Sequence, residues 1–530
     1  MSRPAELLVV RARPLGLAAA DTLAVLDGRV VSGTERELAP LRGPRTRVVD
    51  AHDATVTPGI TDAHIHLVSW ARSLAELNLE PGWSRTRVVE AVRVFAAAHP
   101  DERVLVGRGW VSDGWDAPPD RDSLDAVSPD RPVLLHSKDF HALWVNSAAF
   151  EVAGIAEAVD DPPGGRFERD GRGRLSGVAR EHAVRAFAPA LPVLDPVRER
   201  SRVKEAVRRL HAEGVTGVHD FEGPGESALL RAVCGPEGDT PLRVLMHVPH
   251  AQLEPLLAMG MGSGIGDSWF RLGAVKLFAD GTLGSRTAAM LEPYAGGFGR
   301  GMDLIPPDEL AEIVRRAVTA GVSVAVHAIG DRAVRHALDA FEAASPERLA
   351  ALALPPRIEH AQLVQPADVP RFAALGVAAS MQPVHCVSDR GMAIELWAPW
   401  IDHTYPWADL VRAGAHLAFG SDAPVEPPSV ALGLHAAVTR RKPGAPESET
   451  LSPRQRVDLG TALAAYTRLP ALLAGDPVLG RFERGAGGDL VVWDRDLFAG
   501  PPDTLAEARP AFTVIDGRVV HERVAAVEAA

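Results

Sequence analysis

Eight short apolar segments recur between residues 59 and 422, and several of them follow stretches with helical periodicity. In order they read GITDAHIH, GVTGVHD, LRVLMHV, LGAVKLFAD, VSVAVHAIG, PRIEHAQ, GVAASMQP and AHLAFGSD. The helical stretches at 199–214 and 307–321 each end at a glycine, a residue that suits a helix C-terminus. Strands that alternate with helices build a parallel sheet, and eight such units predict a closed (β/α)8 barrel, an α/β fold.

The two ends of the chain and one long internal stretch fall outside this pattern. Short β-like runs occupy residues 1–58 and 469–530, and neither set alone has enough strands to bury a face. We therefore expect both ends to build one small β-sandwich beside a barrel domain at 59–468. Residues 70–205 hold two further strand-like runs and a Gly/Pro-rich stretch, so we interpret them as a cap subdomain inserted after the first barrel strand.

Composition narrows the class of protein. The 530 residues carry a net charge of −13 without a basic block, which argues against nucleic acid as the main partner. The two cysteines, Cys234 and Cys386, exclude a disulfide framework and favour a reducing cytosol. No stretch approaches the roughly 18 apolar residues of a membrane span, so we expect a cytoplasmic protein without membrane contact. Whether the chain forms a homo-oligomer stays open.

Polar side chains stand at the ends of the apolar segments, where barrel enzymes place their chemistry. His64 and His66 end the first segment, and because strand side chains repeat every two residues, both imidazoles share one face. The corresponding residues of later segments are His219, Asp220, Lys276, His327, His360 and Asp422. Imidazole and carboxylate groups suit Zn²⁺, with Mn²⁺, Fe²⁺ or Co²⁺ as alternatives, so the series predicts a metal centre.

Lys276 is the unusual member of this series. It follows the apolar Val275 in a segment that looks inward-facing, where a free ammonium group is unfavourable. Two solutions are open: Lys276 pairs with a carboxylate, or it reacts with CO₂ and becomes an anionic carbamate that bridges two metal ions.

The motifs also carry a family resemblance that covers nearly the whole chain. In order they are PGITDAHIH, GRGW, WVNSAAF, GVTGVHD, VKLFADGTLGSRT, HAIGD, RIEHAQ, SMQPVH, GSDAP and GDLVVWD. With them the chain resembles the amidohydrolase superfamily of metal-dependent hydrolases. Within it, the chain is most similar to the branch labelled amidohydrolase family 3, whose members resemble N-substituted formamide deformylase. The resemblance implies a distorted TIM-like barrel with a β-sandwich built from both termini.

The resemblance also implies roles for the metal-site residues. His64 and His66 would bind the more buried ion, His327 and His360 would bind a second one, and Asp422 would bind metal and act as general base. Lys276 matches the position that is carboxylated in many binuclear relatives. Some relatives use one ion, and others use a glutamate bridge, for which Glu181 is the weaker candidate.

A chemical mechanism follows from these parts. A metal ion lowers the pKa of bound water so that hydroxide forms at neutral pH. Asp422 would take a proton from it and later deliver that proton to the leaving nitrogen. We expect hydrolysis of a C–N amide-type bond in a small N-acyl or N-formyl compound. A deaminase or another hydrolase of the same superfamily is the near alternative, and a non-catalytic metal-binding protein is the remote one.

Four further residues are candidates for substrate binding, each with a structural alternative. They are Trp110, His141, Arg286 and His385. Trp110 and His141 belong to a segment rich in tryptophan, which would either line an aromatic cap or form the core of the insertion. Arg286 lies in a Gly-rich run and would bind a carbonyl or anionic group, or stabilise its own loop. His385 ends the seventh strand segment and would line the pocket.

Overall fold

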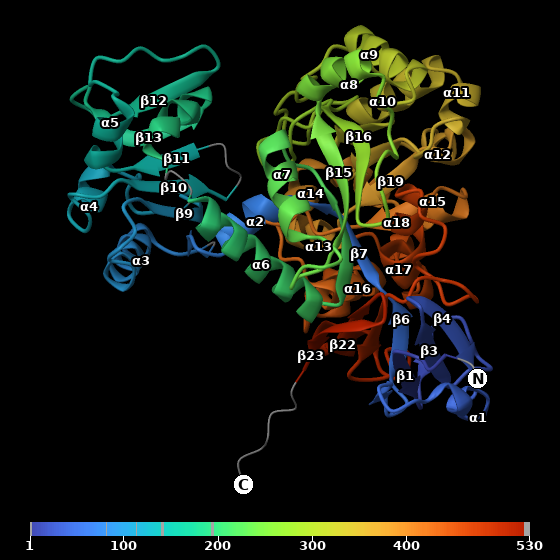
Figure 1. The fold of residues 1–530 in the computed structure, drawn as a ribbon. Helices are drawn as coiled ribbons and strands as arrows, with labels where there is room; N and C mark the ends of the chain where they lie inside the picture. Colours follow the sequence, from blue (N-terminus) through green and yellow to red (C-terminus); the bar gives the residue numbers. More distant parts are fainter. Residues whose placement is uncertain (1–2, 81, 113, 139–141, 192–194, 524–530) are drawn as a thin grey trace. The chain divides into compact units, whose positions relative to one another are not determined.

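A computed structural model gives the fold of the chain (Figure 1). The structure describes residues 3–80, 82–112, 114–138, 142–191 and 195–523. The chain divides into two compact units, and each is described by itself. The first comprises Met1–Val68 with Val203–Ala530, and the second comprises Ser69–Arg202.

Eight parallel strands form the central sheet of the first unit, in the order β20–β19–β18–β17–β16–β15–β14–β7. Their bounds are β7 Ile60–Ile65, β14 Val215–Asp220, β15 Arg243–Pro249, β16 Phe270–Phe278, β17 Val324–Ala328, β18 Arg357–His360, β19 Ala378–Met381 and β20 Leu417–Phe419. Each of the eight apolar segments overlaps one of these strands. The prediction of a (β/α)8 barrel is confirmed.

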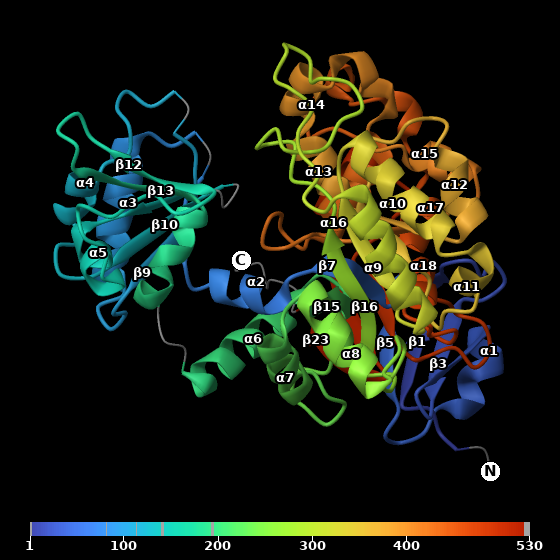
Figure 2. The same ribbon diagram turned by 90° about the horizontal axis from the view of Figure 1, so that it is seen from above.

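Helices connect the strands and cover the outside of the barrel. The main ones are α7 Pro224–Val233, α8 Leu253–Met259, α9 Pro307–Thr319, α10 Asp331–Ala343, α12 Val369–Leu375, α15 Trp407–Arg412, α16 Val430–Thr439 and α17 Leu459–Tyr466. In α9 the buried residues are Leu310, Ile313, Val314, Ala317 and Val318. This spacing places one apolar stripe against the barrel. Figure 2 shows α9 beside α10 on the outside of the strands.

The ring of strands closes just past β20. The N–H of Asp422 donates to the carbonyl of His64 at 2.7 Å, and the N–H of His66 donates to the carbonyl of Ala423 at 2.9 Å. Asp422 has a φ of 61°, in the left-handed region that is unfavourable for a side chain with a Cβ. These backbone bonds bring the end of the first strand next to the residues that follow the last one.

Strands from both ends of the chain lie in two further sheets. The first, β4–β3–β1–β5, uses Arg29–Gly33, Thr22–Leu26, Leu7–Val10 and Arg47–Asp50. The second, β2–β6–β21–β22–β23, uses Arg13–Pro14, Thr55–Pro58, Leu490–Trp493, Pro510–Ile515 and Arg518–Glu522. In this second sheet β6 pairs antiparallel with β21, which joins the two ends of the chain. Val9 and Val25 of the first sheet and Val56 and Leu490 of the second share one hydrophobic cluster.

The second unit has a six-stranded sheet of its own, in the order β12–β13–β11–β10–β9–β8. Its strands are β8 Leu77–Asn78, β9 Leu105–Trp110, β10 Val133–Ser137, β11 Ala142–Val145, β12 Gly165–Arg169 and β13 Leu175–Glu181. Helix α3, Arg85–Ala98, packs its buried valines into a cluster with Trp110 and Trp144. Within the described ranges, none of the helices of either unit combines the length and the apolar character that crossing a membrane requires.

Candidate metal centre

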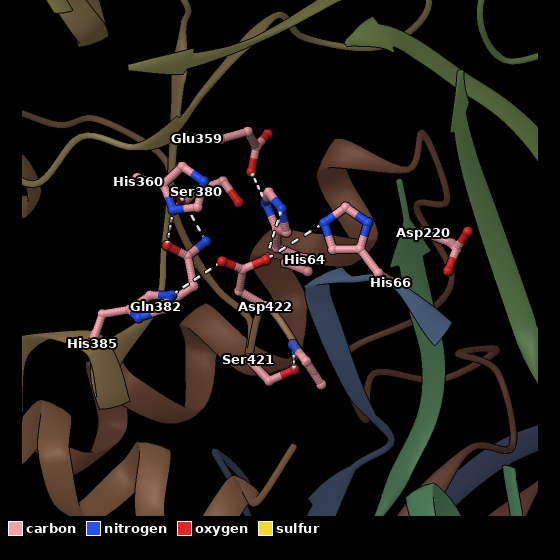
Figure 3. Close-up of polar contacts among 12 residues, drawn as sticks. His64, His66, Asp220, Glu359, His360, Ser380, Gln382, His385, Ser421 and Asp422 are labelled. Atoms are coloured by element: carbon pink, nitrogen blue, oxygen red, sulfur yellow. Dashed lines mark hydrogen bonds and ion pairs between the residues drawn. The ribbon is translucent and has the colours of Figure 1, made fainter. Parts of the chain in front are cut away.

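His64, His66 and Asp422 bring three donor atoms together at the carboxyl end of the barrel strands (Figure 3). The Nε2 atoms of His64 and His66 each lie 3.5 Å from Oδ1 of Asp422. Two ligands bound tetrahedrally to one ion at about 2.1 Å would lie about 3.4 Å apart. The spacing of these donor atoms therefore suits a single ion held by all three.

A second group of donors shares Asp422 with the first. It consists of His360 at the end of β18, His385 and Asp422, whose donor atoms lie within 4.8 Å of one another. Nε2 of His385 lies 3.2 Å from Oδ2 of Asp422, the oxygen that does not face His64 and His66. Asp422 thus stands between two groups of imidazoles, one at each carboxylate oxygen.

The sequence motif predicted that His385 ends the seventh strand, and this prediction is wrong. The strand β19 stops at Met381, and His385 lies on the short helix α13, Pro383–Ser388, that follows it. The first turn of that helix carries the imidazole back toward the strand ends. Sequence reasoning placed His385 in the pocket wall, but the structure places it at hydrogen-bonding distance from Asp422.

Electrostatics favours neutral imidazoles at His64 and His360, beside an ionised Asp422 and a protonated His385. Burial lowers the pKa of His64 to about 4, and burial also holds the pKa of His360 well below its ordinary value. Burial opposes ionisation of Asp422, but the hydrogen bond from His385 and the nearby histidines hold its pKa well below the usual range. Burial likewise lowers the pKa of His385, but Asp422 outweighs this effect and raises it to about 9. Neutral nitrogen donors and a carboxylate match the ligand preference of zinc-like ions.

Two of the histidines are oriented by acceptors behind them. Nδ1 of His64 donates to Oε2 of Glu359 at 2.6 Å, and Nδ1 of His360 donates to Oε1 of Gln382 at 2.9 Å. In both rings this leaves Nε2 with its lone pair available as a ligand. Outer hydrogen bonds of this kind are a usual feature of metal-binding histidines. Sequence reasoning missed Glu359 and Gln382; the signal for Glu359 was a charged residue inside an otherwise buried strand segment.

His327 lies next to these groups but belongs to neither of the two donor clusters found among the described residues. Its ring centre is 4.5 Å from that of His360. Its Nε2 donates to the carbonyl of Gly281 at 3.2 Å and lies 3.6 Å from Oδ1 of Asp280. Burial lowers the pKa of His327 to about 3, so this imidazole is neutral.

Lys276 is buried in β16, with 5% of its surface exposed. Its Nζ lies 4.5 Å from the ring centre of Phe221 and 5.1 Å from that of Phe278. Burial lowers the pKa of Lys276 to about 8, although the charges of Glu359 and Asp422 oppose this effect. Among the described residues no carboxylate lies within 4.0 Å of Nζ, so the carboxylate pairing that the sequence left open is not formed there.

His219 and Asp220, at the end of β14, form hydrogen bonds that stabilise the fold. Nδ1 of His219 accepts a hydrogen bond from Arg357 at 2.8 Å. Oδ1 of Asp220 accepts the N–H of Leu67 at 2.8 Å, at the start of helix α2. Neither residue belongs to a donor cluster.

The remaining candidate residues from the sequence analysis do not belong to the two donor clusters. Arg286 is exposed in the loop after β16, has a φ of 59°, and stacks its guanidinium 4.1 Å from the ring centre of Phe298. Trp110 is buried in the core of the second unit, where its indole N–H donates to the carbonyl of Leu135 at 2.7 Å. Glu181 is an exposed residue of that same unit. His141 lies outside the described residues.

Comparison with known proteins identifies the family of the chain. The sequence profile of the Amidohydrolase family matches residues 47–521. The Bacillus subtilis (strain 168) protein YtcJ is 30% identical, covering 94% of this chain and 95% of its own. The N-substituted formamide deformylase of Arthrobacter pascens is 27% identical over 99% of both chains. The crystal structure of an uncharacterized metal-dependent hydrolase from Pyrococcus horikoshii OT3 is 27% identical, with a TM-score of 0.78 over 94% of this chain and 99% of its own. The chain therefore belongs to the amidohydrolase family and is a metal-dependent hydrolase.

Proposed function

We propose that this hydrolase cleaves a carbon–nitrogen bond of amide type in a small N-acyl or N-formyl compound. The proposal depends on the contacts of Asp422: His64 and His66 lie at one of its carboxylate oxygens, and His385 lies at the other. A carboxylate that faces metal ligands and also a second imidazole can exchange a proton at the reacting centre. The name of the Arthrobacter pascens relative, a formamide deformylase, supports this substrate class.

The donor set fits one ion at His64, His66 and Asp422, with Zn²⁺ preferred over Mn²⁺, Fe²⁺ or Co²⁺. His327 and His360 would hold a second ion. When bound, such an ion supplies a hydroxide nucleophile at neutral pH and polarises the substrate carbonyl. The outer hydrogen bonds of His64 and His360 hold their rings in the tautomer that an ion requires.

Asp422 supplies the proton transfers in this proposal. The side chain of Asp422 is 11% exposed, so bulk water does not surround the carboxylate and its basic oxygen can be directed at the reacting water. It takes the proton of the attacking water and delivers it to the amide nitrogen as the C–N bond breaks, which allows the nitrogen to leave as a neutral amine. His385, at 3.2 Å from Oδ2, steadies the carboxylate between these two transfers.

Lys276 is proposed as a carboxylated bridge between the two ions. Its Nζ is buried among aromatic rings, and the part of the chain that the structure describes places no carboxylate in ion-pair contact with it, an unfavourable setting for an ammonium group. Reaction of the neutral amine with CO₂ forms an N–C bond and releases one proton. The carbamate that results is an anion and would replace the buried cation with a metal ligand.

The direct test is a screen of N-formyl and N-acyl amines, and of compounds with an amino group on an amidine-like carbon, with the zinc-loaded protein, in which carboxylic acid and ammonia are measured separately. The proposal expects acid release that depends on added metal and disappears in Asp422→Asn. Ammonia release without acid would assign the deaminase alternative instead. Absence of metal binding and of turnover would support a non-catalytic protein.

A further inference from the structure

The interior of the barrel contains a charged pair that the proposed mechanism does not use. Arg357 and Glu359 face the same side of β18, and they are 1% and 0% exposed. Barrel interiors are usually filled with branched apolar side chains. Burying two charges is unfavourable unless hydrogen bonds satisfy them, and an apolar pair of similar volume is often as stable. The position of this pair therefore needs an explanation other than stability.

Arg357 is held by contacts from several strands of the barrel. Its Nε donates to Oε1 of Glu359 at 2.5 Å. Its terminal nitrogens contact Nδ1 of His219 at 2.8 Å and donate to the carbonyl of Ala63 at 2.6 Å and to Oγ of Ser380 at 2.5 Å. These contacts fix the guanidinium in one place, and with it the carboxylate of Glu359.

Both carboxylate oxygens of Glu359 already accept hydrogen bonds. Oε1 accepts from Arg357, and Oε2 accepts from both Arg357 at 3.1 Å and Nδ1 of His64 at 2.6 Å. Among the proposed ligands, the one that donates a hydrogen bond to Glu359 is His64, so the carboxylate contacts the metal centre through that imidazole. His360 is supported differently, because the group behind its Nδ1 is the neutral amide of Gln382.

We propose that Arg357 and Glu359 form a positioning pair that sets the affinity of the site at His64 and His66 for its metal ion. This inference rests on the metal centre of the proposed function. The carboxylate keeps the His64 proton on Nδ1, aims the Nε2 lone pair at the ion, and makes His64 a stronger donor than a histidine backed by an amide. Arg357 holds the carboxylate in that orientation. The charged pair thus strengthens the metal site rather than the fold.

The chain offers a matched control for this role. The partly buried Arg243 and the buried Asp489 form another ion pair, with Nε and Nη2 of Arg243 at 2.7 and 2.9 Å from the two oxygens of Asp489. Arg243 begins β15, at the opposite end of the strands from the donor clusters, and neither residue contacts a proposed ligand. Asp489→Asn breaks a comparable pair and reports the effect of a damaged fold alone.

The test measures the zinc affinity of the full-length protein by competition with a chromophoric chelator, and the visible spectrum of its Co²⁺ form. Glu359→Gln is expected to weaken zinc binding by about 10- to 100-fold and to change the Co²⁺ spectrum. Asp489→Asn is expected to leave both unchanged while it lowers the melting temperature. The double variant R357M/E359Q removes both charges, so it leaves no unpaired cation, and it should show the same loss of affinity.

The outcomes separate the two proposals. If the wild-type protein binds zinc and the folded E359Q or R357M/E359Q protein binds it within twofold as tightly, the positioning role is wrong while the metal centre stands. If the wild-type protein binds no divalent ion, the metal centre fails, and the positioning role fails with it.

Discussion

The N–H of Asp422 donates a hydrogen bond of 2.7 Å to the carbonyl of His64, and this bond joins the first barrel strand to the segment after the last one. The side chains of the same two residues face each other, with Nε2 of His64 3.5 Å from Oδ1 of Asp422. Closure of the barrel and assembly of the donor cluster thus involve the same pair of residues.

Replacing the proton carrier should abolish turnover without unfolding the protein. Asp422→Asn keeps the size of the side chain and the backbone bond to His64 but removes the basic oxygen. We expect kcat to fall by about 10³-fold, as for the loss of a general acid–base group. Steady-state kinetics with the best substrate of the screen measures this. Asp503→Asn, a change at a half-exposed surface carboxylate, is the control and should turn over like wild type. Near wild-type kcat in Asp422→Asn would exclude Asp422 as the proton carrier.

Lys276→Met should reduce metal content. Methionine fills a similar space among Phe221 and Phe278 but cannot form a carbamate. We expect the protein prepared with bicarbonate and zinc to lose close to one bound ion per chain, together with most of its activity. Elemental analysis measures the ions, and mass spectrometry of the wild-type protein under CO₂ should detect the added carboxyl group. A Lys276→Met protein with full metal content and activity would remove the bridge from the mechanism.

Metal removal should lower thermal stability as well as activity. An ion that binds only the folded protein stabilises it by about 4 kcal/mol when its free concentration is a thousand times Kd. We expect a chelator to lower the melting temperature of wild type in calorimetry and added zinc to restore it. In a variant with His64 and His66 both changed to Ala, the chelator should have a much smaller effect. An equal shift in both proteins would mean that the stabilising ion binds elsewhere.

A buried histidine away from the metal centre should make the fold sensitive to acid. Nε2 of His211 donates to the carbonyl of Pro241 at 2.8 Å, and burial lowers its pKa from 6.5 to about 4. The unfolded chain therefore takes up this proton before the folded chain does. The contribution to stability is complete above pH 6.5, falls as the pH drops below that value, and levels off near pH 4 at a loss on the order of 3 kcal/mol.

His211→Gln tests this, because glutamine can still donate to Pro241 but does not titrate. Urea unfolding at pH 7.5 and pH 5 should show a smaller loss of the free energy of unfolding in the variant than in wild type. The other buried histidines are common to both proteins, so the difference isolates His211. Identical losses in the two proteins would show that His211 does not set the acid sensitivity.

The strand order of the barrel was readable from the sequence because each strand is a short apolar run with a polar residue at its end. His64, His66, His360 and Asp422 were recognised for the same reason: strand ends of a parallel barrel meet at one rim. The geometry brings these four into the donor clusters, while their roles as ligands stay predictions. Lys276 was recognised as unusual because a cation is rare in such a run.

The partners of these residues could not be read from the sequence. Glu359 supports His64 from a strand nearly 300 positions later in the chain, and only the closed barrel brings the two together. His385 was assigned to a strand end, although a helix begins at Pro383 and turns its imidazole toward Asp422. Such contacts depend on how the chain leaves each strand, and local periodicity carries no information about that.

Anomalous diffraction at the zinc absorption edge, from crystals of the zinc-loaded protein, tests the metal centre most directly. We predict a peak about 2.0–2.2 Å from Nε2 of His64, Nε2 of His66 and a carboxylate oxygen of Asp422. A zinc-loaded crystal without a peak among these three side chains, or with its only peak elsewhere on the protein, would contradict the account.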